Sequence, residues 1–257
     1  MIALETVVHS GLFVGLAVTL LWLLSLQLRD VSIVDIWWGP GFAVIAWTAS
    51  STPLDANLRY GAALCLLTLW AVRLGTYLWI RNSGHPEDRR YQAIRAATPG
   101  FPLKSLFTVF WLQGALQLLV ALPVFSIATS TAPFSWVDMI GLFLMVSGLV
   151  IEAVADEQLR RFKAEPDNAG KVMDRGLWGW SRHPNYFGNA LIWAGVGVLG
   201  MGAHAPVWAL LGPATMWFLL LRVSGVTMLE STIVDRRPAY RRYMERVPSF
   251  FPRPPRT

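Results

Sequence analysis

Long apolar runs alternate with short polar segments along most of this chain. Seven of the runs are long enough to form helices that cross a lipid bilayer, which takes about 20 residues. We place them at about 9–28, 33–50, 58–80, 103–127, 136–158, 185–202 and 205–229. The pattern predicts an all-α, polytopic membrane protein in which residues 1–257 form a single seven-helix domain.

The composition supports this class of protein. The chain is 54% hydrophobic and 15% charged, whereas soluble domains carry about 25% charged residues. A single cysteine, Cys65, excludes an intrachain disulfide and a cysteine-rich metal site. The basic residues lie in short segments between the predicted spans, so we expect no nucleic-acid partner. We also expect a monomer that binds no metal.

These basic segments also predict the topology. They lie at about 81–104, 160–182 and 236–257. The connections that contain neither Lys nor Arg lie near 51–57, 128–135 and 203–204. Because positive loops stay in the cytoplasm, we expect the N-terminus outside and the C-terminus in the cytoplasm.

A carboxylate begins the second predicted span. Asp35 lies in "VSIVDIWWGPGF", and a charge within a span is costly unless it faces a cavity or a partner. It could stabilise the helix dipole near the interface, or line a site where Trp37 and Trp38 contact a flat apolar ligand. Arg73 and Tyr77 share one face of the third span, and Asp35 would be a suitable partner for Arg73.

The fifth predicted span ends in a charged stripe. Glu152, Asp156 and Arg160 follow at intervals of four residues, with Lys163 near the same face. Neighbouring carboxylates repel each other at this spacing. Either Asp156 pairs with Arg160 within the helix, or the acids accept hydrogen bonds from a ligand while Arg160 and Lys163 bind its phosphate.

The stretch "WGWSRHPNYFGNALIWAG", residues 178–195, sets polar side chains at the start of the sixth span. Pro184 suits the first turn of a helix, and Ser181 could cap it. Arg182 and His183 precede that helix, and Asn185 and Asn189 share one of its faces. This is either an interfacial anchor or an anion site at a helix N-terminus.

Taken together, these segments resemble the steroid 5α-reductase C-terminal domain superfamily. The resemblance is carried by "ADEQLRRFK", "GLWGWSRHPNYFGNALIWAG" and "RRPAYRRYMERVPSFFPRPP". Two further segments, "VDIWWG" and "RNSGHPEDRRYQAIR", are similar to its bacterial branch. The resemblance implies a multi-pass protein of the bacterial inner membrane. It also implies cytosolic loops that cover NADPH, and a hydrophobic substrate that enters from the bilayer.

The resemblance also implies site residues. Asp35 and Tyr77 are the nearest matches to the superfamily's catalytic acid and tyrosine, and Trp37 and Trp38 are expected to contact substrate. The animal enzymes carry an acid where Asn189 stands. The expected cofactor-binding residues are Arg73, Asn82, Tyr91, Glu152, Asp156, Arg160, Lys163, Arg175, Trp178, Ser181, Arg182, His183, Asn185, Tyr186, Asn189 and Glu230.

The implied activity is that of an NADPH-dependent oxidoreductase resembling 3-oxo-5α-steroid 4-dehydrogenases. It would transfer hydride to the β-carbon of an enone, here a Δ4-3-oxosteroid. No GxGxxG follows a strand, so side chains at helix ends must hold the dinucleotide, and the basic loops favour NADPH over NADH. Tyr77, oriented by Asp35, would donate to the carbonyl oxygen that gains negative charge.

Two other functions stay open. A membrane methyltransferase that uses S-adenosylmethionine, of the isoprenylcysteine carboxyl methyltransferase type, shares the RHPxYxG element. It also shares a Glu near the last helix, here Glu230. The positive stripe of Arg160 and Lys163 favours NADPH, because S-adenosylmethionine has no pyrophosphate. A non-enzymatic lipid-binding or scaffolding protein would leave the charges within the spans unexplained.

Overall fold

A computed structural model describes residues 4–49, 57–223, 226, 230, 233 and 239–254 of this chain. Within these ranges every regular element is a helix, so the all-α prediction is confirmed. The chain divides into two compact units. One comprises Met1–Ser135 and Leu199–Gly212, and the other Trp136–Val198 and Pro213–Thr257. Parts of the predicted seventh span and of the basic tail, including Arg236, Arg237 and Arg256, lie outside the described residues.

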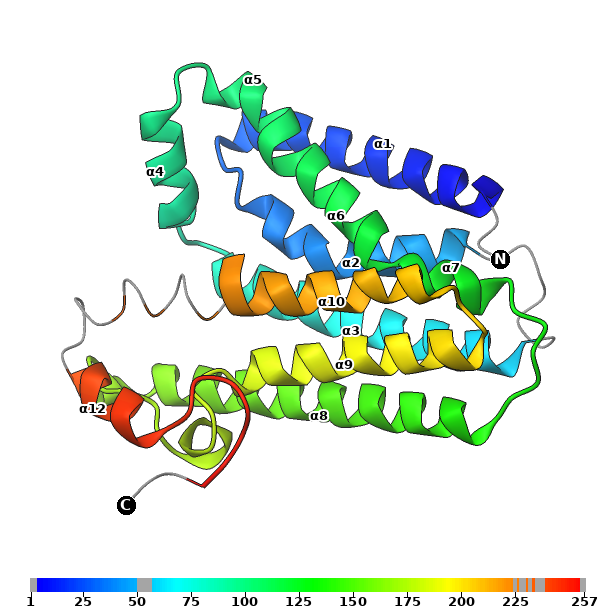
Figure 1. Cartoon of the computed structure of the whole chain (residues 1–257). Coiled ribbons are helices and arrows are strands. Elements are labelled where there is room, and N and C mark those ends of the chain that lie inside the picture. The colour runs from blue at the N-terminus through cyan, green and yellow to red at the C-terminus, as the bar shows by residue number, and fades with distance from the viewer. Residues whose placement is uncertain are drawn as a thin grey trace. The chain divides into compact units, whose positions relative to one another are not determined.

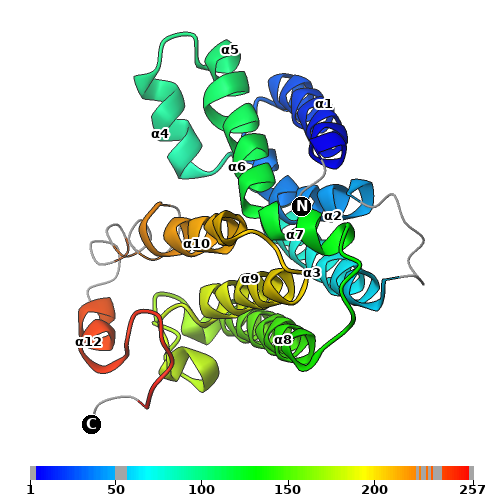
Figure 2. The same ribbon diagram turned by 45° about the vertical axis from the view of Figure 1, so that its right-hand side comes forward.

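The first unit is built on three long helices, and α2 packs against both of its neighbours, α1 and α3 (Figures 1 and 2). Glycines allow α2 and α3 to approach each other closely, because a Cβ on Gly75 would lie 2.9 Å from Cγ of Pro40. The elements of this unit are α1 (Leu4–Leu28), α2 (Ile33–Thr48), α3 (Leu58–Asn82), α4 (Arg89–Ala97), α5 (Phe101–Ser105), the π-helical turn η2 (Leu106–Trp111), α6 (Leu112–Val120), α7 (Leu122–Ala128) and the short turn η5 (Val207–Leu210).

The predicted fourth span, 103–127, is interrupted. Its helix ends at Val120, and α7 begins after Ala121 with Pro123 in its first turn. Proline has no amide hydrogen to donate to the carbonyl four residues earlier and clashes with that carbonyl. The proline therefore explains why one apolar run forms two helices.

The second unit is built on α8 and α9, which pack through glycines. A Cβ on Gly188 would lie 2.6 Å from the backbone nitrogen of Glu152, and one on Gly195 would lie 2.5 Å from the carbonyl oxygen of Gly141. The two helices therefore run antiparallel with their backbones in contact. The elements are α8 (Trp136–Ala164), η3 (Pro166–Asn168), η4 (Gly176–Gly179), α9 (Pro184–Gly202), α10 (Leu211–Phe218), η6 (Leu219–Val223) and α12 (Ala239–Arg246). α9 and α10 each contain residues of both units, because Leu199–Gly212 belongs to the first unit.

Four helical stretches are long and apolar enough to cross a membrane. They are Leu4–Leu28, Leu58–Asn82, Phe101–Val120 and Trp136–Ala164. α2, with 16 residues, is shorter than a typical span, and Val207–Val223 is a shorter apolar helix. The structure thus supports a membrane protein, while the count of seven spans and the orientation remain predictions.

Candidate functional site

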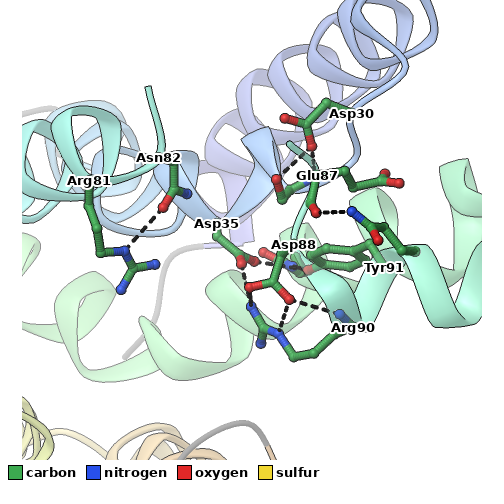
Figure 3. A network of polar contacts seen from close by, with 11 residues as sticks. Asp30, Asp35, Arg81, Asn82, Glu87, Asp88, Arg90 and Tyr91 are labelled. Atoms are coloured by element: carbon green, nitrogen blue, oxygen red, sulfur yellow. Dashed lines mark hydrogen bonds and ion pairs between the residues drawn. The ribbon is translucent and has the colours of Figure 1, made fainter. Parts of the chain in front are cut away.

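Asp35 is the centre of a polar network in the first unit (Figure 3). Tyr91 donates its hydroxyl to Oδ1 of Asp35 at 2.9 Å, and Arg90 donates from Nη2 to Oδ2 at 2.7 Å. Gln113 donates in turn to the hydroxyl of Tyr91 at 3.3 Å. Both oxygens of the carboxylate are thus bonded to side chains of α4.

The sequence around α4 explains how the helix reaches Asp35. Asp88 caps its N-terminus, accepting from the backbone nitrogen of Arg90 at 2.9 Å, as expected of an acidic N-cap. Glu87 accepts from the backbone nitrogen of Val31 at 2.8 Å and from Nε and Nη2 of Arg95 at 3.0 and 2.7 Å. Asp88 thus begins the helix, and Glu87 holds the segment 87–95 against the α1–α2 connection.

Tyr91 remains a protonated hydroxyl in this network. Burial raises the pKa of Tyr91, and the negative charge of Asp35 and the hydrogen bond to it raise that pKa further. The hydroxyl is therefore a donor throughout the physiological pH range.

Two other predicted residues of the first unit, Tyr77 and Asn82, contact Arg81 in the last turns of α3. Asn82 is the last residue of α3 and accepts from Nε of Arg81 at 3.1 Å. The Arg81 guanidinium lies over the ring of Tyr77, 5.9 Å from its centroid. The tyrosine that donates to Asp35 is Tyr91, which the sequence assigned to cofactor binding. The partner that sequence reasoning missed is Arg90, because its place in "EDRRY" does not mark it out from Arg89.

The two predicted substrate tryptophans lie in α2. Trp38 accepts at its carbonyl from Nε2 of Gln117 at 2.8 Å, and its ring meets Phe42 edge-on at 5.3 Å. The indole nitrogen of Trp37 is buried and has no hydrogen-bond partner among the described residues. An indole N–H in that state suits an acceptor atom on a ligand.

In the second unit, the guanidinium of Arg182 donates nearly all of its hydrogen bonds to the chain itself. The side chain is buried, and its Nε and Nη2 donate to the two carboxylate oxygens of Glu230 at 2.7 and 2.9 Å. Nη1 donates to the carbonyls of Met244 at 3.0 Å and Val247 at 2.7 Å. Four of its five N–H donors therefore hold the chain's own C-terminal part.

The residues beside Arg182 extend this attachment. The backbone nitrogen of Arg182 donates to the carbonyl of Pro248 at 2.9 Å, and that of Arg253 donates to the carbonyl of Trp180 at 3.0 Å. The hydroxyl of Ser181 donates to the carbonyl of Phe250 at 2.8 Å. We call residues 244–253 the C-terminal clamp, because they are tied along residues 180–182 by main-chain and side-chain bonds.

Glu230 is held as a carboxylate. Burial raises the pKa of Glu230, but the hydrogen bonds from His183 and Arg182 and the charge of Arg182 outweigh it, so the pKa falls to about 2. Nε2 of His183 lies 3.0 Å from Oε1 of Glu230, and the His183 ring stacks on Tyr186 at 5.5 Å. Such a carboxylate is a weak base at neutral pH.

A second group of predicted residues lies between α8 and α9. Asn185 donates from Nδ2 to Oδ1 of Asp156 at 3.1 Å. Asn189 is one turn further along α9, at the level where Gly188 meets Glu152. Glu152, Asp156 and Asn189 are all buried, and Oδ1 of Asn189 has no hydrogen-bond partner among the described residues. The open acceptor in this group is Oδ1 of Asn189, and it suits a ligand that brings a hydroxyl or amide donor.

Of the remaining predicted residues of this unit, one is buried in its packing and three are exposed. Trp178 is buried and donates from its indole nitrogen to the carbonyl of Ala155 at 2.9 Å. Arg160, Lys163 and Arg175 are exposed. Arg160 donates to both carboxylate oxygens of Glu157, at 2.6 and 2.8 Å. Arg160 thus pairs with an acid three residues away in its own helix, Glu157, which the sequence-based prediction did not consider.

The comparisons with known proteins identify the family of this chain. A protein of Schizosaccharomyces pombe, the uncharacterized protein C594.04c, is 29% identical over 269 residues, covering 91% of this chain and 76% of the relative. No solved structure matches the chain significantly. The family DUF1295, described as a protein of unknown function, matches residues 21–247. Since that match covers most of the sequence, the chain belongs to the DUF1295 family, a domain of the steroid 5α-reductase-like superfamily.

Proposed function

We propose that this protein is an NADPH-dependent membrane reductase that saturates the double bond of an enone in a flat hydrophobic molecule, with a Δ4-3-oxosteroid as the first substrate to test. Membership of a steroid 5α-reductase-like family supports the reaction class. The apolar helices support a substrate that arrives from the bilayer.

The observation that carries the proposal is the buried acceptor group on α8 and α9. A buried carbonyl oxygen without a partner, as in Asn189, is costly unless a ligand supplies a donor. The ribose hydroxyls and the carboxamide of a nicotinamide dinucleotide are donors of that kind. We assign Glu152, Asp156, Asn185 and Asn189 to these groups.

The exposed cations at the end of α8 and after it suit the phosphates. Arg160 and Lys163 lie in the last two turns of α8, and Arg175 precedes η4. Guanidinium and ammonium groups form strong charge-assisted bonds with phosphate oxygens. Arg182 has a different role in this proposal, since Glu230 and the clamp carbonyls already use its donors. It positions the clamp and does not touch the phosphates.

NADPH, when bound, would supply the hydride to the β-carbon of the enone. The negative charge that then develops on the carbonyl oxygen needs a hydrogen-bond donor, and a proton completes the reduction at the α-carbon. Asp35 accepts from a tyrosine hydroxyl in the structure, and on substrate binding that hydroxyl would turn its one hydrogen to the carbonyl oxygen. That tyrosine is Tyr91, so we propose Tyr91 as the donor ahead of Tyr77.

The methyltransferase alternative is less well supported. Its corresponding acid, Glu230, accepts both donors of the Arg182 fork and has a pKa of about 2. A carboxylate so committed is a poor base for deprotonating a methyl acceptor. We therefore favour the reductase.

The test uses purified protein in detergent with NADPH and testosterone. The expected result is a fall in reduced-nicotinamide absorbance together with formation of the 5α-reduced steroid. Asn189→Leu should weaken NADPH binding about tenfold, the effect of one lost hydrogen bond in a buried site. Asn189→Asp, which keeps an acceptor oxygen, should retain binding. Tyr91→Phe should lower turnover at least about a hundredfold with NADPH still bound.

Other results would refute parts of this proposal. If methyl transfer from S-adenosylmethionine occurred and NADPH did not bind, the reductase would be wrong. If Tyr91→Phe kept wild-type turnover while Tyr77→Phe abolished it, the donor would be Tyr77 as the sequence suggests.

A further inference from the structure

A pocket in the first unit is lined by none of the residues assigned above to cofactor, substrate or catalysis. It has a volume of ≈ 400 Å³ and is lined by Ser25, Leu26, Arg29, Val31, Glu87, Arg95 and Pro102. That volume is within the range of about 300–1,000 Å³ typical of small-ligand pockets. The indole nitrogen of Trp22 donates to the carbonyl of Pro102 at 2.8 Å, which joins the end of α1 to the start of α5 beside the pocket.

Arg29 is held in an unfavourable backbone conformation at this pocket. It follows the last residue of α1 with a φ of 55°, in the left-handed region that glycine adopts without steric cost. Its exposed side chain has no hydrogen bond or ion pair within the described ranges. The guanidinium of Arg29 is therefore available to a ligand in the pocket, although glycine would fit this backbone position better.

Arg95 offers further donors to the same pocket. Its Nε and one N–H of Nη2 bind Glu87, so Nη1 has no acceptor in the part of the chain that the structure describes. The Arg95 guanidinium also lies over the ring of Phe101, 5.2 Å from the centroid, which limits its freedom to move. Two guanidiniums with open N–H groups form a site for a phosphate, which they can grip at two oxygens.

Two carboxylates near these arginines indicate which kind of phosphate compound the pocket would bind. Glu87 lines the pocket, and Asp30 is close enough for its charge to raise the pKa of Arg95; Figure 3 shows these two carboxylates on the same side of the network. They balance the two arginines, so a doubly charged phosphate monoester would be disfavoured. A phosphate diester with an ammonium group beside it matches this arrangement of charges.

The surface of α1 indicates that such a ligand carries acyl chains. An 18-residue window of α1 has a mean hydropathy of 2.1, and Leu20, Leu24 and Leu28 are exposed on one face that leads toward Arg29. Acyl chains could cover these leucines while the headgroup occupies the pocket. We propose that this pocket binds the zwitterionic headgroup of a phospholipid of the phosphatidylethanolamine type, with Arg29 and Arg95 on the phosphate. The proposal does not depend on the reductase activity.

The test measures lipid binding to the intact protein in detergent. Native mass spectrometry should find one phosphatidylethanolamine retained by the wild-type protein, and added dioctanoyl phosphatidylethanolamine should raise its melting temperature. Arg29→Gly should bind this lipid about tenfold more weakly, as expected for loss of a charge-assisted contact. Its melting temperature without lipid should not fall, because glycine accepts the φ of 55°. Arg29→Lys, which keeps the charge without the fork, should be intermediate.

The control is Arg89→Ala, which removes an exposed cation of α4 outside the pocket lining and should leave lipid binding unchanged. Three results would overturn the proposal. Arg29→Gly could bind the lipid as tightly as the wild type, or Arg89→Ala could weaken binding to the same extent. Inorganic phosphate alone could stabilise the wild type as much as the lipid does, which would make this a site for a free anion.

Discussion

Replacing Arg182 by leucine should release the C-terminal clamp. The substitution leaves the carboxylate of Glu230, whose side chain is 13% exposed, without its cation. It also removes the donors to the carbonyls of Met244 and Val247. Breaking a buried ion pair by deleting one partner costs about 3–5 kcal/mol. We therefore expect the clamp to open more easily by about that amount.

A neighbouring pair provides the matched control. Arg246 lies 3.3 Å from Asp174, and the two side chains are 55% and 40% exposed. An exposed ion pair of this kind contributes about 0–1 kcal/mol, so Arg246→Leu should change little. The difference between the two variants should be about 3 kcal/mol.

Hydrogen exchange measures that difference locally. The amides of Val247 and Arg253 donate to the carbonyls of Tyr243 and Trp180 and so report on the clamp. Since about 1.4 kcal/mol corresponds to a factor of ten, Arg182→Leu should speed exchange at both amides by about a hundredfold or more. Equal acceleration by Arg182→Leu and Arg246→Leu would refute this explanation of the clamp.

The same pair predicts how the clamp responds to pH. The pKa of Glu230 falls from 4.5 to about 2 in the folded state, which at about 1.4 kcal/mol per pKa unit corresponds to about 3 kcal/mol of stabilisation. A carboxylate whose pKa is lowered by folding stabilises the folded state at pH values above its pKa in the unfolded chain. This stabilisation should therefore be complete above about pH 4.5 and be lost as the pH falls toward 2. Glu230→Gln should remove most of that dependence.

Two further substitutions test the packing and the polar network. Gly188→Ala should destabilise the second unit by about 1–3 kcal/mol, because the new Cβ would lie 2.6 Å from the Glu152 backbone. Unfolding in mixed micelles measures this change. The control is Gly15→Ala, where the new Cβ has nothing within 4 Å and should have no effect on stability. An equal effect of the two would contradict the close packing. Asp35→Asn should loosen α4 by about 1–2 kcal/mol, since it weakens the bonds to Arg90 and Tyr91; faster proteolysis within residues 89–97 would show this, and unchanged cleavage would argue against it.

The long apolar runs determined the helical fold. Apolar runs of this length are favourable only when their backbone bonds are satisfied internally, as they are in helices. The predicted spans at 58–80 and 136–158 correspond to Leu58–Asn82 and Trp136–Ala164. The start of α9 at Pro184 follows from proline's fixed φ. The break at Ala121 was also present in the sequence, as Pro123, but the apolar run concealed it.

Local spacing brought together the polar residues of the candidate site without deciding their partners. Asn185 and Asn189 lie on one face of α9, as their spacing requires. Arg160, in contrast, has two acids within reach along its own helix, and it donates to Glu157, which the sequence-based prediction did not consider. Spacing alone cannot rank such neighbours, because the free energies of the alternative pairs differ by only tenths of a kcal/mol.

Only the tertiary structure decided the long-range pairs. Tyr91 reaches Asp35 across 56 residues of sequence, and Arg182 reaches Glu230 across 48. A pattern of apolar positions fixes which face of a helix is buried. It says nothing about which helix that face meets, because any apolar surface can pack on another. Charged groups select their partners by distance and direction once the backbone is in place, and this is why Arg182, predicted as an anion ligand, holds the chain's own carboxylate.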